Sequence, residues 1–123
     1  MDRLKNKVAI VTGGGSGIGE STSKIFAREG AIVAVVDIDD KNGQRVVKEI
    51  KTAGGSAEYW HMDISNEKEV EKTIADIIKK FGKLNVLINN AGIAGTGGPL
   101  ENITTEQFDH VINVNLRGTF FCA

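Results

Sequence analysis

The stretch that decides the fold is Thr12-Gly13-Gly14-Gly15-Ser16-Gly17-Ile18-Gly19, between a β-branched run over residues 7–12 and a helical pattern over residues 17–29. A turn this tight needs residues that tolerate positive φ angles, and a phosphate can approach the backbone only where no Cβ blocks it. The following helix directs free N–H groups and its positive dipole end at the same point. The stretch predicts a strand–turn–helix unit that binds a nucleotide diphosphate, although a close helix–strand turn alone would also need these glycines.

The rest of the chain alternates apolar patterns of the same two kinds. Short apolar runs predict further strands over residues 32–37, 57–62 and 84–88. Apolar residues at helical spacing predict a helix over residues 41–53, a second that is capped by Ser65 or Asn66 and closed by Gly82, and a third that is capped by Thr104 or Thr105 and reaches about Val114. Another helix is expected to begin near Leu116. Glycine follows the first three helices as a stop signal.

This alternation, with short connections, predicts how the elements assemble. Parallel strands joined by right-handed helical crossovers form a sheet with helices on both faces. We therefore expect one domain over residues 1–123 with a Rossmann-type, doubly wound α/β fold, three layers and strand order 3-2-1-4. The glycine-rich residues 92–98 form a long irregular segment after the fourth strand, where open α/β sheets bind ligands.

Composition excludes several classes of protein. Of the 123 residues, 41% are hydrophobic and 25% charged, which is ordinary for a globular domain and excludes disorder. The 15 basic and 16 acidic residues leave no positive field for nucleic acid or an anionic membrane. A single cysteine, Cys122, cannot form an intrachain disulfide, and the two histidines are expected to be ordinary surface or core residues, so no metal site is predicted. A cytoplasmic protein is expected, since no signal peptide is recognisable.

An acid at the end of the second predicted strand bears on the choice of nucleotide. Asp37 stands where a carboxylate can accept hydrogen bonds from the ribose hydroxyls of adenosine and would repel a 2′-phosphate. Ser16 and Ile38, the residues best placed to hold such a phosphate, are not basic. Asp37 therefore favours NAD over NADP, unless it is only a solvated member of the acidic run at residues 37–40.

Four motifs together resemble the short-chain dehydrogenase/reductase family. The turn has the spacing Thr-Gly-x-x-x-Gly-x-Gly of that family, and Asp63-Ile64 is similar to its adenine-pocket residues. Asn89-Asn90-Ala91-Gly92 resembles its Asn-Asn-Ala-Gly motif, and residues 113–120 resemble the segment with its helical catalytic asparagine. The resemblance covers nearly the whole chain. Asn85 and Phe108 stand where the family often has aspartate and tryptophan, and both departures look structural.

The resemblance assigns a role to each matching residue. Asp63 would accept a hydrogen bond from the adenine amino group, Ile64 would pack on the ring, and Thr12 would tie the first strand to the Asn-Asn-Ala-Gly loop. Asn115 would be catalytic, holding a water molecule in a proton relay at a local helix break. With Asp37 and Ile38, the residues expected to bind NAD are Gly13, Ser16, Gly17, Ile18, Gly19, Asp37, Ile38, Asp63, Ile64, Asn90, Ala91 and Gly92.

Simpler explanations remain for these motifs. Asp63 could cap the helix that follows it, and Asn89 and Asn90 could satisfy the backbone of their own turn. Asn115 could mark a plain helix end, because asparagine competes for backbone hydrogen bonds within a helix.

The family's reaction needs further groups that these 123 residues lack. A tyrosine with a lysine four residues on serves as the general acid/base, and a serine polarises the carbonyl. The one tyrosine here, Tyr59, lies on a predicted strand and has Asp63 at that spacing. We therefore expect the N-terminal portion of a longer enzyme, truncated before these residues and inactive alone.

The whole enzyme is expected to be an NAD-dependent oxidoreductase that interconverts a small secondary alcohol and a ketone. By resemblance it would form a tetramer or dimer. An NADPH-linked reductase of 3-oxoacyl thioesters shares the same motifs, although Asp37 argues against it. A chain complete at 123 residues would instead be a non-catalytic dinucleotide-binding or interaction module. Substrate contacts could come only from residues 93–100, so the substrate is not predicted.

Overall fold

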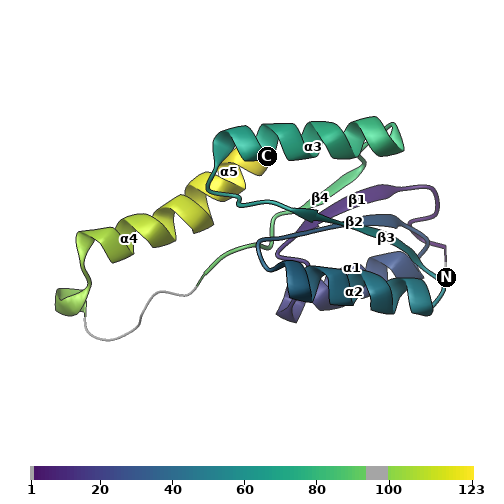
Figure 1. Ribbon diagram of the computed structural model, residues 1–123, viewed down its shortest axis with the longest axis horizontal. Helices are drawn as coiled ribbons and strands as arrows, with labels where there is room; N and C mark the ends of the chain where they lie inside the picture. Colours follow the sequence, from purple (N-terminus) through teal and green to yellow (C-terminus); the bar gives the residue numbers. More distant parts are fainter. Residues whose placement is uncertain (1, 94–99) are drawn as a thin grey trace.

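The computed structural model describes residues 2–93 and 100–123. Strands and helices alternate through the first seven elements (Figure 1): β1 (Val8–Thr12), α1 (Gly17–Arg28), β2 (Ile32–Asp37), α2 (Asp40–Thr52), β3 (Ser56–His61), α3 (Glu67–Phe81) and β4 (Val86–Ile88). A short 3-10 turn (Leu100–Asn102) and the helices α4 (Thr105–Ile112) and α5 (Gly118–Cys122) follow, with a π-helical stretch, Asn113–Arg117, between the two helices.

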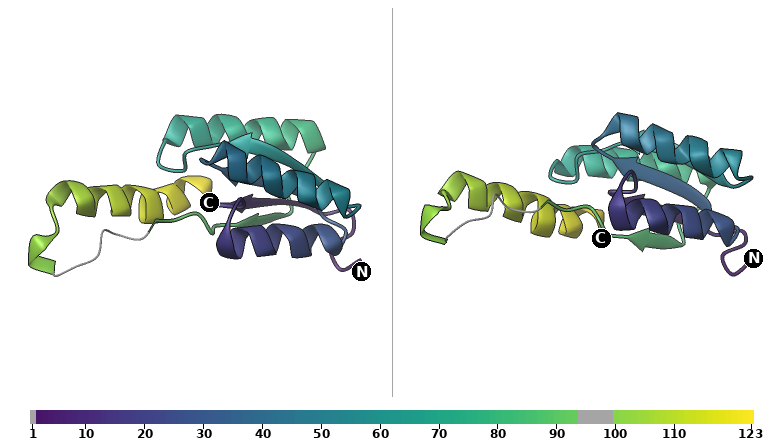
Figure 2. Two further views of the ribbon diagram at one scale, coloured as in Figure 1. Left: turned by 60° about the horizontal axis from the view of Figure 1, so that its bottom comes forward. Right: turned by 90° about the horizontal axis from the view of Figure 1, so that it is seen from below.

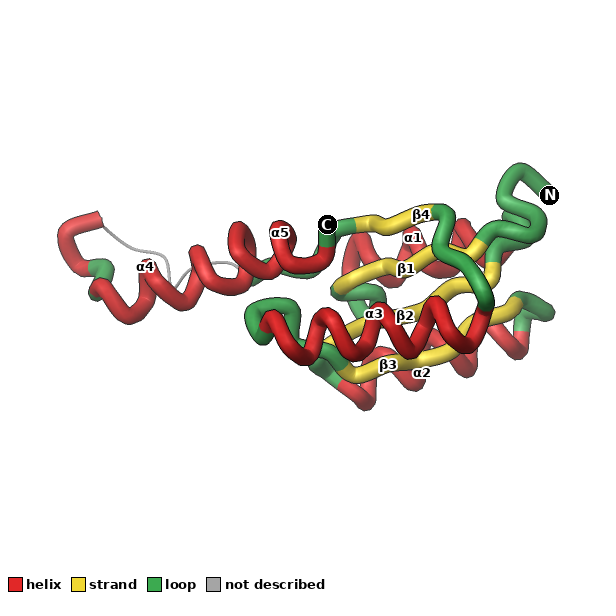
Figure 3. The backbone as a smooth tube through the Cα atoms, turned by 90° about the horizontal axis from the view of Figure 1, so that it is seen from above, coloured by secondary structure: helices red, strands yellow, loops and turns green. Residues whose placement is uncertain are grey.

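Among the described residues, four strands form one parallel sheet in the order β3-β2-β1-β4. Residues 8–12 of β1 pair with residues 32–36 of β2, and residues 9–11 pair with residues 86–88 of β4. Figure 3 shows the strands side by side in this order. The predicted Rossmann-type fold and its strand order are confirmed.

Helices cover both faces of the sheet, α1 and α2 on one and α3 with α5 on the other (Figure 1). Because side chains alternate along a strand, β2 contributes to both cores. Val33 and Val35 pack with residues of α1 and α2, whereas Ala34 and Val36 pack with residues of α3 and α5. Such burial on both faces explains why the sequences of β1 and β2 are continuous apolar runs.

Local signals set the ends of the helices. The side chains of Asp39 and Asn66 accept hydrogen bonds from Asn42 N–H and Glu69 N–H, and so cap the first turns of α2 and α3. At the other end of α3, Gly82 adopts a left-handed conformation with φ of 80°. The two N-caps lie in strand-to-helix loops, and so they help to place the residues at the carboxyl end of the sheet.

The predicted helix break near Asn115 takes the form of a π-helix within one continuous helical arm. Five residues in the wider π conformation join α4 to α5 instead of a gap. Figure 2 shows α4 reaching beyond the sheet while α5 lies against it. None of the helices in the described part of the chain is long and apolar enough to cross a membrane.

The fourth strand is shorter than expected, and one expected segment falls outside the described residues. The fourth strand was expected over residues 84–88, but its ladder begins at Val86. Asn85 explains the difference, because its side-chain Oδ1, rather than a backbone carbonyl, accepts the hydrogen bond from Val8 N–H at 2.9 Å. The irregular segment expected over residues 92–98, and most of the substrate contacts expected from 93–100, lie outside the described residues.

Candidate nucleotide-binding site

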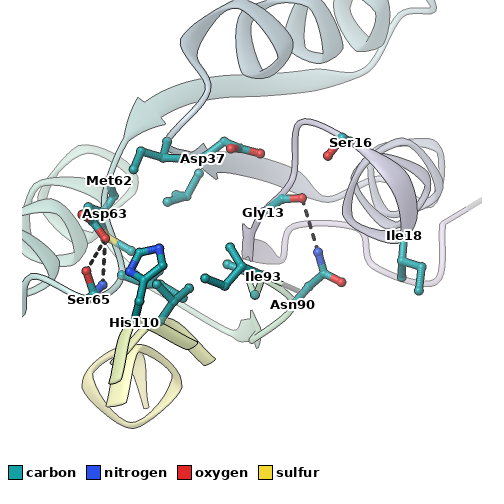
Figure 4. Close-up of a pocket in the computed structure, with 16 residues that line it drawn as sticks. Gly13, Ser16, Ile18, Asp37, Met62, Asp63, Ser65, Asn90, Ile93 and His110 are labelled. Carbon is teal, nitrogen blue, oxygen red and sulfur yellow. Dashed lines mark hydrogen bonds between the residues drawn. The ribbon is translucent and has the colours of Figure 1, made fainter. Parts of the chain in front are cut away.

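A cavity of about 410 Å³ opens at the carboxyl end of the sheet, where open parallel sheets bind ligands (Figure 4). Most of the residues predicted to bind the cofactor line it together: Gly13, Ser16, Ile18, Asp37, Ile38, Asp63, Ile64, Asn90, Ala91 and Gly92. Gly17, Gly19 and Asn115 are not among the lining residues. Residues from four separate loops therefore converge on one pocket.

The glycine-rich turn has the geometry that its sequence predicts. Gly13 and Gly17 adopt positive φ angles of 64° and 54°. A Cβ on Gly19 would lie 2.0 Å from the carbonyl oxygen of Gly13, so no larger residue fits between the turn and α1. A Cβ on Gly17 would meet nothing within 4 Å. Gly19 thus allows the start of α1 to lie close to the carbonyl oxygen of Gly13, while Gly17 leaves open space beside the turn.

The N-terminus of α1 is free to bind an anion. Ser16 is its N-cap, but the Ser16 side chain makes no capping hydrogen bond. The N–H groups of a first helical turn have no partner inside the helix and carry its positive dipole end. Ser16 and Ile18 line the pocket, and the Ile18 side chain is 78% exposed. The arrangement can therefore bind a phosphate group through backbone N–H groups.

Asp37 joins the end of β2 to the glycine-rich turn. Its Oδ2 accepts a hydrogen bond from Gly15 N–H at 2.9 Å, and its Oδ1 accepts one from Asp39 N–H at 3.0 Å. The carboxylate lines the pocket beside Ile38, whose side chain is 60% exposed. Asp37 is therefore more than a solvated member of an acidic run, because it holds the turn in place.

Asp63 is fixed from two sides. Its Oδ1 accepts hydrogen bonds from the N–H and the hydroxyl of Ser65, at 2.9 and 2.7 Å, and its own N–H donates to Oε1 of Glu69 at 3.0 Å. Asn66, and not Asp63, caps α3 with its side chain. Ile64 is almost fully buried but reaches the pocket wall.

Thr12 ties β1 to the loop that follows β4, as the sequence predicts. The Thr12 hydroxyl accepts hydrogen bonds from Asn90 N–H at 3.0 Å and Ala91 N–H at 2.9 Å, and donates to the carbonyl oxygen of Ile88 at 3.3 Å. The Asn90 side chain donates to the carbonyl oxygen of Thr12. It also donates to the carbonyl oxygen of Gly13 (Figure 4). The Asn-Asn-Ala-Gly loop and the glycine-rich turn are thus one hydrogen-bonded unit.

Asn115 binds the segment after that loop. Its Oδ1 accepts a hydrogen bond from Ile93 N–H at 2.7 Å, and its Nδ2 donates to the carbonyl oxygen of Ile93 at 2.8 Å. Both ends of the amide are therefore occupied by one residue of the chain. The bonds place the π-helix beside the loop that lines the pocket.

Sequence reasoning missed six lining residues: Val36, Met62, Ser65, Ile93, His110 and Val114. Val36 and Met62 directly precede the predicted acids Asp37 and Asp63, so their strand positions were a usable signal. His110 and Val114 lie on the helical arm, and only the fold brings that arm to the pocket. Lysine and arginine are absent from the lining residues that the structure describes.

Comparisons with known proteins agree with this geometry. Residues 7–123 match the family model described as short chain dehydrogenase. The chain is 44% identical to the uncharacterized oxidoreductase YxbG of Bacillus subtilis over 124 residues, which cover 100% of this chain and 45% of that protein. The chain spans about half the length of the curated relatives that it matches.

Two solved structures are similar over almost the whole chain. A 3-ketoacyl-(acyl-carrier-protein) reductase from Brucella melitensis, complexed with NADH, has 41% sequence identity and a TM-score of 0.90 over 97% of this chain and 48% of that one. A metagenomic short-chain oxidoreductase in complex with NADP has 33% identity and a TM-score of 0.92 over 97% and 54%. Because residues 7–123 of this chain match the family model, the chain belongs to the short-chain dehydrogenase/reductase family.

Proposed function

We propose that this chain is the cofactor-binding portion of an NAD-dependent oxidoreductase that interconverts a secondary alcohol and a ketone. The observation that carries the proposal is Asp37, whose carboxylate lines the pocket beside the glycine-rich turn, while the described lining residues include no lysine or arginine. A carboxylate at this point favours free ribose hydroxyls over a 2′-phosphate.

The residues present fit a dinucleotide. The space left open at Gly17 and the uncapped N-terminus of α1 would accept the diphosphate, and Ile64 with Val114 offers an apolar wall for adenine. Asp63 would accept a hydrogen bond from the adenine amino group, and Asn90, Ala91 and Gly92 would line the way to the second ribose. When bound, the nicotinamide ring supplies the hydride acceptor or donor.

The acid/base chemistry would come from residues outside this chain. Burial, together with a hydrogen bond to Asp40, raises the pKa of the Tyr59 hydroxyl, which is the opposite of what a general base at neutral pH needs. We propose that the remainder of a longer protein contributes the tyrosine–lysine pair and the serine. Asn115, held on the π-helix, would assist by positioning a water molecule.

Two further parts of the proposal concern a second substrate candidate and the oligomeric state. A 3-oxoacyl thioester is the second substrate candidate, because one of the similar structures is a 3-ketoacyl reductase. A homo-oligomer is supported by apolar side chains left uncovered on the helical arm, where Phe108, Leu116 and Phe120 are all more than half exposed.

The cofactor preference can be tested by titrating the intact protein with NAD⁺ and NADP⁺. We expect wild-type protein to bind NAD⁺ at least about tenfold more tightly than NADP⁺, since the 2′-phosphate would meet the Asp37 carboxylate, with no lysine or arginine among the described lining residues. Asp37→Ala should narrow this ratio, and Ile38→Arg should narrow it while leaving the Asp37–Gly15 hydrogen bond intact. Equal affinities in the wild type, or a ratio that neither substitution changes, would contradict the proposal for Asp37.

Turnover provides the test of enzymatic function. We expect the intact protein to reduce NAD⁺ with secondary alcohols. A purified protein that binds NAD⁺, has an intact mass near 13.2 kDa and turns over no substrate would instead be a dinucleotide-binding module.

A further inference from the structure

A chain of polar side chains lies beside the pocket without lining it. It consists of Asp40 on α2, Tyr59 and His61 on β3, and Glu69 on α3, and we call it the His61 network. Nδ1 of His61 lies 2.7 Å from Oδ1 of Asp40, and its Nε2 lies 3.9 Å from Oε1 of Glu69. His61 therefore stands between the helices that follow β2 and β3.

The direction of the hydrogen bond between His61 and Asp40 follows from the charge of Asp40. Hydrogen bonds from Tyr59 and His61 hold the pKa of the Asp40 carboxyl below its usual range, so this group is an ionised acceptor at neutral pH. Nδ1 of His61 is therefore the donor. Nε2 is left on the Glu69 side, where it makes an ion-pair contact whenever the imidazole is protonated.

The network ends on the two acids that line the pocket. The Tyr59 hydroxyl, which hydrogen-bonds Asp40, also lies 2.9 Å from the backbone carbonyl oxygen of Asp37. At the other end, Oε1 of Glu69 accepts the hydrogen bond from Asp63 N–H at 3.0 Å. Each acid thus has one backbone group in contact with an end of the same network: the carbonyl oxygen of Asp37, which shares the single Tyr59 hydroxyl proton with Asp40, and the N–H of Asp63.

We propose that His61 is a positioning residue for the adenosine end of the pocket, where it fixes the Asp37 loop relative to the Asp63 loop through Asp40 and Glu69. This inference rests on the proposed binding of an adenine dinucleotide. Asp37 is proposed to hold the ribose and Asp63 the adenine amino group of one adenosine. A change in their separation therefore weakens both contacts at once, and the ligand class affected is any nucleotide with an adenosine 5′-phosphate.

Because its side chains are exposed, we expect the His61 network to position the two loops and to add little to the stability of the fold. The side chains of His61 and Asp40 are 49% and 60% exposed, and exposed ion pairs contribute little to the free energy of unfolding. Substitutions at His61 should therefore leave the protein folded, while the loops that the network joins gain freedom.

The test uses three substitutions of His61 in the intact protein, with AMP and NAD⁺ as probes in calorimetric titrations. The side-chain amide nitrogen of asparagine lies near the position of histidine Nδ1, so His61→Asn keeps the hydrogen bond to Asp40. The amide nitrogen of glutamine lies near the position of Nε2, so His61→Gln keeps only the contact with Glu69. We expect His61→Ala to weaken AMP and NAD⁺ binding by the same factor, about two- to tenfold, as for the loss of one hydrogen bond. His61→Asn and His61→Gln each keep only one of the two contacts, so the affinity of each should lie between those of wild type and His61→Ala, with His61→Asn the tighter binder because it keeps the shorter contact. A His61→Asn variant that binds AMP as tightly as wild type would contradict the role of the Glu69 contact.

The matched control is the other ion pair between β3 and α3, which Glu58 and Lys80 form away from the network. Glu58→Gln should leave AMP affinity unchanged. An equal loss in Glu58→Gln and His61→Ala, or a His61→Asn variant as weak as His61→Ala, would overturn the role of His61. Wild-type protein that binds neither AMP nor NAD⁺ would overturn the proposed function itself, whereas wild-type binding that His61→Ala leaves unchanged would overturn only the inference.

Discussion

At Gly43, a single contact with a residue distant in the sequence excludes any side chain larger than that of glycine. It lies inside α2, where a Cβ would stand 2.1 Å from Cε1 of the Tyr59 ring. Alanine normally stabilises a helix by about 0.5–1 kcal/mol relative to glycine, but this clash reverses the sign. Gly43→Ala should lower the free energy of unfolding by about 1–3 kcal/mol in urea titrations. Gln44→Ala, at an exposed neighbour, should not lower it, and a Gly43→Ala variant more stable than wild type would contradict the predicted clash.

The sequence predicts which residues line the pocket better than it predicts which residues hydrogen-bond to one another. Asp37, Asp63 and Asn90 stand at strand ends, and parallel strands bring their carboxyl ends together, so their convergence was predictable. The bonds of Asn115 to Ile93 and of His61 to Asp40 were not, because each joins residues about twenty positions apart on different elements. No local pattern encodes such a pair.

At the scale of elements, α1 and α2 are joined by an ionic cluster. Arg45 and Lys24 both contact Glu20, and both also contact Glu49. Arg45 further donates a hydrogen bond to the carbonyl oxygen of Gly15, so the cluster reaches the glycine-rich turn. Hydrogen bonds from Arg45 and Lys24 lower the pKa of Glu20 from 4.5 to about 2.

The lowered pKa of Glu20 predicts the pH range in which this cluster acts. A depressed folded-state pKa gives stability that is fully present above pH 4.5 and lost as the pH falls toward 2. Because the partners are partly exposed, Glu20→Gln should cost only about 1 kcal/mol at pH 7 and progressively less below pH 4. Urea unfolding at pH 7 and pH 3 measures this, with Glu71→Gln on α3 as the control. A Glu20→Gln effect that stays constant between these two pH values would count against the cluster.

Element boundaries were predictable where the signal is local. Gly82 ends α3 as expected, because only its left-handed conformation closes the last turn there. The start of β4 was not predictable, because the Asn85 side chain accepts the hydrogen bond of Val8 N–H in place of a strand carbonyl. Val8 is 77 residues away in the sequence. The π-helix was expected only as a break, since its extra backbone width depends on how α4 and α5 continue into one another.

At the scale of the whole molecule, the pocket depends on elements far apart in the sequence. The glycine-rich turn after β1, the end of β2, the loops after β3 and β4, and the helical arm each contribute lining residues. The strand order predicts that the segments at the carboxyl ends of the strands meet, but the sequence of α4 alone does not predict that this helix lies beside the pocket. The arm is held there by α5 against α3 and by the Asn115 bonds to Ile93.

Asn115 is therefore the residue at which the arm and the pocket loop can be uncoupled. It does not line the cavity, so Asn115→Ala should weaken NAD⁺ binding by no more than about threefold, a small free-energy change. Turnover of the intact protein should fall by about a hundredfold or more if Asn115 also positions a proton-relay water. Hydrogen exchange at Ile93 N–H should accelerate, because that amide loses its acceptor. Asn113→Ala, two residues away on the same π-helix, is the control and should change none of these three quantities. Equal losses in affinity and turnover for Asn115→Ala would assign this residue a structural role only.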